Sequence, residues 1–188
     1  MGVSHVDRRR QEQPRGREST ALRGRAHVYA GARISADDII PLRHQNGGAE
    51  EDLGRHALAG IDPGFPGRVQ KGDILVAGHE FGCGSGREHA VWALRGAGIA
   101  AVVAVSFSRL FFRNALNNGF IVVECPEAVR QAAVGDLLEV DLRDAAVRNL
   151  TKGESYRFVP LTPFAMEILE AGGLLPHVLR QTTRASSA

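Results

Sequence analysis

The apolar positions in the middle of the chain form short continuous runs, which are typical of strands covered on both faces of a sheet. These runs lie at residues 73–78 (DILVAG), 99–105 (IAAVVAV) and 120–124 (FIVVE). Helical patterns separate them at residues 87–95 and 107–117, and Ser106 is placed to cap the second helix. This alternation of strands and helices predicts an α/β fold with a parallel sheet at its centre.

The two ends of the chain carry different patterns. Alternating residues at 24–30 predict a first strand, whereas short apolar stretches at 137–142, 146–150 and 156–159 predict antiparallel strands joined by turns. A last helix is expected at 163–171, where a pair of glycines follows it. The antiparallel strands therefore add to the parallel core.

The same patterns predict one folded domain, at residues 23–180, with a segment on either side. Residues 1–22 are polar and rich in arginine without any hydrophobic period, so we expect a disordered tail. Residues 181–188 are expected to form a flexible C-terminus. Inside the domain, residues 42–54 are expected to be a loop that leads into a short helix.

The distribution of charge argues against a nucleic-acid partner. The net charge is +2, but seven arginines and only three acidic residues lie within residues 1–25, so the rest of the chain is slightly acidic. A nucleic-acid-binding domain concentrates positive charge on its folded surface. We therefore expect no binding of nucleic acid.

Cysteine content and hydropathy bear on compartment and cofactor. No apolar run is long enough to span a bilayer, and the first residues lack the apolar stretch of a signal peptide. Cys83 and Cys125 are the only cysteines, fewer than the three or four thiolates that usually hold an iron–sulfur cluster. The sequence predicts a reduced cytoplasmic protein that is not inserted in a membrane and binds no metal by itself.

The segment Phe81–Ala90 (FGCGSGREHA) is the clearest candidate for chemistry. It joins a predicted buried strand to the start of a helix, where unpaired N–H groups and the helix dipole attract anions. Gly84 and Gly86 allow a ligand to approach the backbone and leave the hydroxyl of Ser85 projecting between them. Arg87 adds a planar guanidinium that can bind a carboxylate with two hydrogen bonds.

Three other interpretations of this segment stay open from the residues alone. The glycines could serve only a tight turn between strand and helix. A dinucleotide site is disfavoured, because the third glycine of the usual fingerprint would fall at Arg87 and no acidic residue ends the next strand. Cys83 could be a nucleophile with His89 as its base, although a buried, inert cysteine and a packed histidine fit the pattern better.

The segment resembles a known family. FGCGSGREHA is similar to the GCGSSREHA loop of the swivelling domain of the aconitase superfamily, and most closely to separate small subunits of 3-isopropylmalate dehydratase and homoaconitase. The resemblance covers roughly residues 23–178 and includes 37–41 (DDIIP), 106–119 (SFSRLFFRNALNNG), 124–126 (ECP) and 168–174 (ILEAGGL). It implies a swivelling β/β/α domain, with a parallel sheet core flanked by helices and additional antiparallel strands.

The resemblance also implies an activity. Members of the family are hydro-lyases that move a hydroxyl between adjacent carbons of a di- or tricarboxylic acid, here 2-isopropylmalate and 3-isopropylmalate of leucine biosynthesis. The hydroxyl leaves onto one iron of a 4Fe-4S cluster. By position, Ser85 matches the serine that removes the proton from the neighbouring carbon, and Arg87 matches the arginine that holds a substrate carboxylate.

Other site residues and the partner follow from the same match. Asp37 is expected to shape the substrate site, with a turn or helix-cap role as the alternative, and Gly84 and Gly86 to bind substrate through the loop. Arg43 lies where members of the isopropylmalate type carry a specificity loop, and is expected to contact substrate. Because the cluster ligands of the family come from a large subunit, we expect that partner to carry the cluster, in a heterodimer or, as the open alternative, a heterotetramer.

Three departures from the family pattern leave the exact substrate open. Gly86 stands in place of a second serine, Ala36 in place of a threonine, and residues 42–47 (LRHQNG) differ from the usual specificity loop. The alternatives are the small subunit of a homoaconitase, a citraconate or methylmalate hydratase or another aconitase-like hydratase, or a non-catalytic carboxylate-binding protein. The presence of both Ser85 and Arg87 favours an enzyme.

Overall fold

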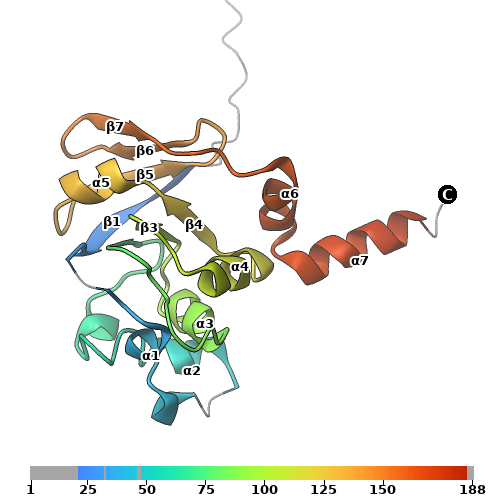
Figure 1. The fold of residues 1–188 in the computed structure, drawn as a ribbon, viewed down its shortest axis with the longest axis horizontal. Coiled ribbons are helices and arrows are strands. Elements are labelled where there is room, and N and C mark those ends of the chain that lie inside the picture. The colour runs from blue at the N-terminus through green and yellow to red at the C-terminus, as the bar shows by residue number, and fades with distance from the viewer. Residues whose placement is uncertain (1–20, 32, 46–47, 186–188) are drawn as a thin grey trace, which may run out of the picture.

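A computed structural model describes residues 21–31, 33–45 and 48–185 of the chain. It contains one seven-stranded sheet in the order β4-β3-β2-β1-β5-β6-β7 (Figure 1). The strands are β1 (Ala21–Tyr29), β2 (Ile74–Ala77), β3 (Ala101–Ala104), β4 (Ile121–Glu124), β5 (Leu137–Asp141), β6 (Ala146–Asn149) and β7 (Glu154–Arg157). Strands β1 to β4 run parallel and β5 to β7 antiparallel, which confirms the predicted fold class.

Strand β1 joins the two halves of the sheet. Its first residues, 21–25, pair antiparallel with β5, and residues 26–29 pair parallel with β2. The strand begins at Ala21, earlier than the alternation predicted, so Ala21 and Leu22 belong to the sheet and not to a disordered tail. The prediction for residues 1–20 lies outside the described part of the chain.

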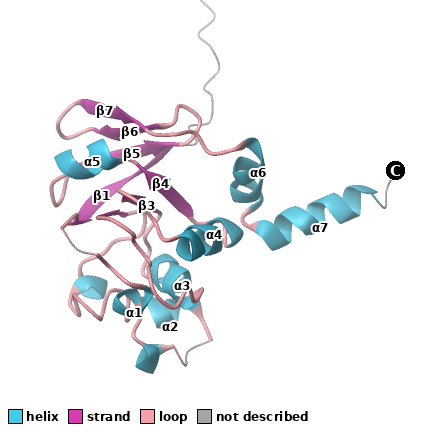
Figure 2. Cartoon of the chain, viewed as in Figure 1, coloured by secondary structure: helices cyan, strands magenta, loops and turns pink. Residues whose placement is uncertain are grey.

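Helices cover both faces of the parallel half. The helices α1 (Ala36–Ile39), α2 (Glu50–Gly54), α3 (His89–Gly96) and α4 (Arg109–Asn117) pack on one face, and α5 (Pro126–Gln131) packs on the other (Figure 2). In β2, Leu75 and Ala77 belong to the first core, and Ile74 and Val76 to the second. Both faces of this strand are therefore buried, which explains its unbroken apolar run.

The predicted helices differ from the structure in where they begin. Helix α3 begins at His89, two residues later than expected. Helix α4 is capped by Ser108, whose Oγ accepts the N–H of Phe111, and not by Ser106. Ser106 Oγ accepts the N–H of Glu80 instead, and so ties the segment before α4 to the turn after β2.

The C-terminal part of the chain holds a helix that the sequence patterns did not predict. Helix α6 (Pro163–Ala171) ends at Gly172 in the left-handed conformation, and α7 (Leu174–Ala185) follows directly. Figure 1 shows α7 extending away from the rest of the molecule. Residues 181–185, predicted to be flexible, continue this helix. No helix in the described residues has the length and apolar character needed to cross a membrane.

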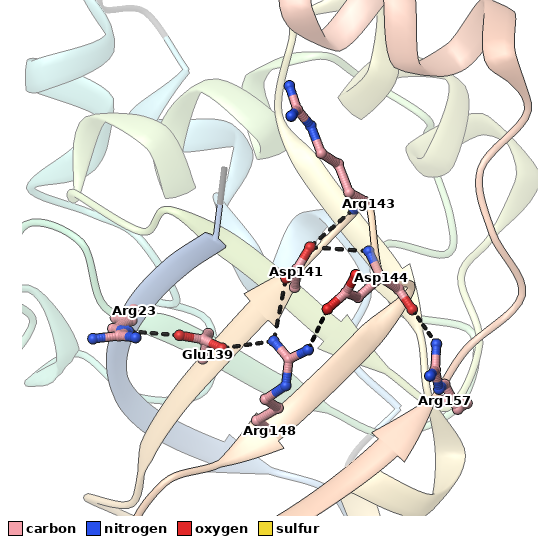
Figure 3. Close-up of polar contacts among 7 residues, drawn as sticks. All are labelled: Arg23, Glu139, Asp141, Arg143, Asp144, Arg148 and Arg157. Atoms are coloured by element: carbon pink, nitrogen blue, oxygen red, sulfur yellow. Dashed lines mark hydrogen bonds and ion pairs between the residues drawn. The ribbon is translucent and has the colours of Figure 1, made fainter. Parts of the chain in front are cut away.

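The face of β5 and β6 carries a group of ion pairs, which we call the Arg148 cluster (Figure 3). The guanidinium of Arg148 lies 2.7 Å from Glu139, 3.2 Å from Asp141 and 2.6 Å from Asp144. The Nε of Arg23 donates to the second oxygen of Glu139 at 2.6 Å. The carboxylate of Glu139 is buried, and both of its oxygens accept hydrogen bonds. Burying a charge is costly unless it is paired, and these bonds supply the pairing.

Candidate active site

Two loops meet at the carboxyl ends of β1 and β2. Because these strands are parallel neighbours, the chain leaves both at the same edge of the sheet, where ligands of such folds commonly bind. Gly82 donates its N–H to the carbonyl of Ile34 at 2.8 Å, and Ala36 donates to the carbonyl of Cys83 at 2.7 Å. These two hydrogen bonds bring Asp37, the next residue along, beside the glycine-rich loop.

The segment before α4 holds the loop from its other side. Phe81 donates its N–H to the carbonyl of Ser106, and Ser108 donates its N–H to the carbonyl of Phe81, both at 3.0 Å. The Oγ of Ser108 also donates to the carbonyl of Gly82 at 2.8 Å. The start of the loop is thereby fixed between two neighbouring segments.

Helix α4 also fixes the end of the loop. Asn114 Nδ2 donates to the carbonyl of Gly86 at 2.7 Å. Gly86 has a φ of 63°, and a Cβ at this position would lie 2.6 Å from Leu110 Cδ1. Glycine therefore suits both the backbone and the packing here, which gives a physical reason for the departure from the family's second serine.

Four consecutive backbone N–H groups in the second half of the loop have no acceptor among the described residues. Among the described residues, no group accepts a hydrogen bond from the N–H of Gly84, Ser85, Gly86 or Arg87. The loop leads into α3, whose N-terminus at His89 adds the positive end of a helix dipole. Donors without an acceptor at this place are available to an anion, so the binding of an anion here stays a prediction.

The candidate side chains converge on this loop. Ser85 Oγ lies 3.5 Å from Asp37 Oδ1, and Arg87 Nη1 lies 3.7 Å from the same oxygen. Arg87 Nη1 donates to Gln45 Oε1 at 3.0 Å. Serine, arginine and carboxylate thus share one small region, contributed by the loops after β1 and β2.

The adjacent aspartates, Asp37 and Asp38, have different tasks. Asp38 Oδ2 accepts hydrogen bonds from the N–H and the Oγ of Ser35. In return, Ser35 Oγ accepts the N–H of Asp38. These reciprocal bonds form a capping box at the start of α1. Asp37 takes no part in this cap; its side chain is 57% exposed to solvent, and its Oδ1 faces Ser85 and Arg87. The cap role that the sequence left open for Asp37 therefore belongs to Ser35 and Asp38.

Arg43 lies in the neighbouring 3₁₀ turn η1 (Leu42–His44) but does not join this group. Its Nε donates to His44 Nε2 at 3.1 Å, and the ring of His44 stacks on His56 with 3.9 Å between centroids. Desolvation, followed by the proximity of His56 and Arg43, lowers the pKa of His44. A substrate-binding role for Arg43 stays a prediction.

The structure does not bring Cys83 and His89 together as a nucleophile and its base. The ring of His89 packs 5.0 Å from that of Trp92, and its buried Nδ1 has no hydrogen-bond partner among the described residues. Cys125 lies in the second core, where burial raises the pKa of its thiol. Within the described ranges, no three His, Cys, Asp or Glu side chains gather as a metal site would require, so the donors present do not fit a 4Fe-4S cluster.

The candidate site is an open surface and not an enclosed cavity. Ser85 is exposed, and the side chain of Arg87 is 38% exposed. An apolar cavity of about 310 Å³ lies elsewhere, between α4, β4 and residues 158–162. Chemistry that must exclude water would therefore need a second protein surface over the loop.

Sequence reasoning missed three residues whose side chains bond to the candidate site. Ser108 and Asn114 lie inside the motif at residues 106–119 that carried the resemblance, but the motif did not reveal that they bond the loop's carbonyls. Gln45 lies in the stretch that departs from the family, and nothing in its spacing indicated a contact with Arg87, which lies 42 positions along the chain. Only the fold brings these residues to the loop.

A loop that carries a serine, an arginine and N–H groups without described acceptors, at the edge of a mixed sheet, is an arrangement suited to a carboxylate ligand. The model of the Aconitase C-terminal domain family matches residues 42–128. The small subunit of 3-isopropylmalate dehydratase from Moorella thermoacetica is 48% identical over 160 residues, which cover 85% of this chain and 96% of that protein. The chain belongs to the family of 3-isopropylmalate dehydratase small subunits.

Two proteins from Methanocaldococcus jannaschii are also similar. The small subunit of an isopropylmalate/citramalate isomerase is 44% identical over 160 residues, 85% of this chain and 95% of that protein. A crystal structure of a 3-isopropylmalate dehydratase superposes with a TM-score of 0.84 at 36% identity, and covers 89% of this chain and 98% of that one. These comparisons confirm the predicted family and fold.

Proposed function

We propose that this chain is the small subunit of a hydro-lyase that interconverts 2-isopropylmalate and 3-isopropylmalate by dehydration and rehydration. The observation that carries the proposal is the arrangement of Ser85 and Arg87 on a loop where four N–H groups have no acceptor within the described part of the chain. The family supports this activity over that of a non-catalytic carboxylate-binding protein. The proposal places the chain in leucine biosynthesis and, as a reduced protein, in the cytoplasm.

Each group on the loop has a distinct role in the proposed reaction. The guanidinium of Arg87 and the free N–H groups of residues 84–87 bind the substrate's carboxylates. Ser85 Oγ removes the proton from the carbon next to the one that carries the hydroxyl. A serine is a weak base unless its anion is stabilised, and the same positive surroundings stabilise it.

Asp37 contributes to the proposed reaction because it lies beside both Ser85 and Arg87. Its Oδ1 lies 3.5 Å from Ser85 Oγ and 3.7 Å from Arg87 Nη1, so it can accept the hydroxyl proton while Arg87 balances its charge. Its exposure leaves room for movement when substrate binds. We assign Asp37 to shaping the site and orienting the hydroxyl of Ser85.

The remaining parts of the enzyme are proposed to come from a large subunit. The donors of the described residues do not fit a 4Fe-4S cluster, and the chain's relatives are named as small subunits. We therefore propose a heterodimer whose large subunit carries the cluster and covers the exposed loop. In that assembly this chain supplies the proton-transferring serine and the carboxylate-binding arginine.

Coexpression with the cognate large subunit under anaerobic conditions tests the proposal. Hydration of isopropylmaleate should be the fastest reaction, and homoaconitate and citraconate should be assayed beside it because one relative is named for both isopropylmalate and citramalate. Faster turnover of another acid would change the substrate assignment. With a fully loaded cluster, no turnover of any of the three acids would leave only the non-catalytic alternative.

A further inference from the structure

Gln45 contacts the candidate arginine from the stretch, residues 42–47, that departs from the family's usual specificity loop, and it has no role in the proposed function above. It follows the 3₁₀ turn Leu42–His44, and its Oε1 accepts a hydrogen bond from Arg87 Nη1 at 3.0 Å. Its Nε2 donates to the carbonyl of Ile40 at 2.9 Å. We propose that Gln45 is the positioning residue for Arg87, which holds the guanidinium in place for the substrate carboxylate.

The contacts of Arg87 show why a positioning residue is needed. Its side chain is 38% exposed, and Asp37 Oδ1 lies 3.7 Å from Nη1, beyond hydrogen-bond distance. Among the described residues, Gln45 is the side chain that accepts a hydrogen bond from this guanidinium. Because a partly exposed arginine has many rotamers, this bond reduces the freedom that substrate binding would otherwise have to remove.

The amide of Gln45 has only one orientation that satisfies both neighbours. The carbonyl of Ile40 can only accept a hydrogen bond, and the guanidinium of Arg87 can only donate one. The NH₂ group must therefore face Ile40 and the oxygen must face Arg87. Ile40 and the following Pro41 are buried, so the amide is anchored to a fixed part of the fold.

A neutral acceptor suits this position better than a charged one. The amide oxygen fixes one N–H of Arg87 and leaves the positive charge available to an anionic substrate. A glutamate at the same place would pair with Arg87 and, together with Asp37, would compete with the substrate carboxylate. The identity of residue 45 should therefore control substrate affinity through Arg87.

The inference rests on the proposed function and is tested with the assembled, cluster-loaded enzyme. Gln45→Met keeps the length of the side chain but removes the acceptor, and should raise KM for 3-isopropylmalate by about tenfold at every pH, with kcat within about twofold. Gln45→Glu should raise KM further near pH 8. As the pH falls towards the glutamate's pKa, its KM should approach that of wild type, because a protonated carboxyl again offers a neutral acceptor.

Matched variants at Gln131 serve as controls. This residue is exposed at the end of α5, on the opposite face of the sheet, and its side chain makes no hydrogen bond to the described residues. Gln131→Met and Gln131→Glu should leave KM and its pH dependence unchanged. An unchanged KM in Gln45→Met, or a Gln45→Glu variant whose KM follows wild type at all pH values, would overturn the inference.

Calorimetry of 3-isopropylmalate binding to the same complexes separates this inference from the proposed function. If wild type binds the acid without turnover, the proposed function fails, and the dissociation constants of the Gln45 variants still decide the role of Gln45. Equal constants for wild type and Gln45→Met would refute the positioning role. If wild type neither binds nor turns over the acid, both proposals fail.

Discussion

Two polar surfaces of this molecule use charged groups in opposite ways. In the Arg148 cluster, the guanidinium meets three carboxylates at 2.6 to 3.2 Å, and Arg23 bonds the remaining oxygen of Glu139 (Figure 3). At the loop after β2, the groups stand 3.0 to 3.7 Å apart, and four consecutive N–H groups donate to no described acceptor. The charged groups of the Arg148 cluster find their partners within the chain, whereas these loop N–H groups have none among the described residues.

The difference separates groups that stabilise the fold from groups that await a ligand. Saturated ion pairs between neighbouring strands hold those strands together and offer little to a ligand. Donors beside a helix N-terminus that have no acceptor among the described residues can exchange water for an anion. Mutations in the Arg148 cluster should therefore lower stability with little effect on activity. Mutations at the loop should lower activity with little effect on stability.

Replacing Ser85 with alanine should have the largest effect. If Ser85 Oγ removes the substrate proton, kcat should fall by roughly 10³-fold or more, while the thermal midpoint of the chain changes by less than about 1 °C because Ser85 is exposed. Steady-state kinetics of the assembled enzyme and thermal unfolding of the chain provide the two measurements. Cluster content and subunit association should equal those of wild type, and activity within a few-fold of wild type would exclude Ser85 as the base.

Replacing Arg87 with lysine should have the next largest effect. Lysine keeps the charge but loses the planar fork and the fixed contact with Gln45, so kcat/KM should fall by about 10- to 100-fold. The loss should appear mainly in KM, and stability should not change. A matched Arg143→Lys variant, at an exposed residue outside the site, should behave as wild type, and equal kinetics for both variants would contradict the assignment of Arg87.

The sequence predicted much of the parallel core because its strands are buried on both faces and give unbroken apolar runs. It misplaced the start of α4, because Ser106 and Ser108 are both suitable caps and only the tertiary contacts choose between them. Helix α7 was missed, since the pair of glycines before it reads as an end of structure. A pair of glycines can end one helix and still be followed directly by another, so the local pattern did not reveal α7.

The same limit applies to the site. Ser85 and Arg87 were identified because they lie together on a loop with a recognisable motif. Gln45 contacts Arg87 only because β1 and β2 are parallel neighbours, which brings the chain after β1 to the loop after β2. Contacts that depend on strand order are not encoded in the local spacing of residues.

Replacing Arg148 with methionine tests the other surface. The variant leaves Asp141 and the buried Glu139 without their shared partner, so the thermal midpoint should fall by roughly 3 to 6 °C. Activity of the assembled enzyme below that temperature should be unchanged. The matched control is Arg143→Met, whose side chain points away from the cluster and should not alter the midpoint (Figure 3). An equal midpoint for the two variants would show that the cluster contributes nothing to stability.

The smallest effect concerns how stability depends on pH. Hydrogen bonds from Arg148 first, and from Arg23 second, lower the pKa of Glu139 below its ordinary value of 4.5, against the opposing effect of burial. The folded state therefore binds this proton less readily than the unfolded state, so the stabilisation is complete above about pH 5 and is lost as the pH falls below about 4. In Arg148→Met the pKa shift is smaller, and the thermal midpoint should fall less steeply between pH 5 and pH 3 than in wild type or in Arg143→Met. Thermal unfolding across this range measures the slope; parallel slopes for all three proteins would mean that Arg148 does not set the titration of Glu139.

Because Ser85 and Arg87 lie outside the cluster, variants at the loop should keep the wild-type slope of the thermal midpoint against pH. The two surfaces would then differ in the pH dependence of stability as well as in their effect on activity.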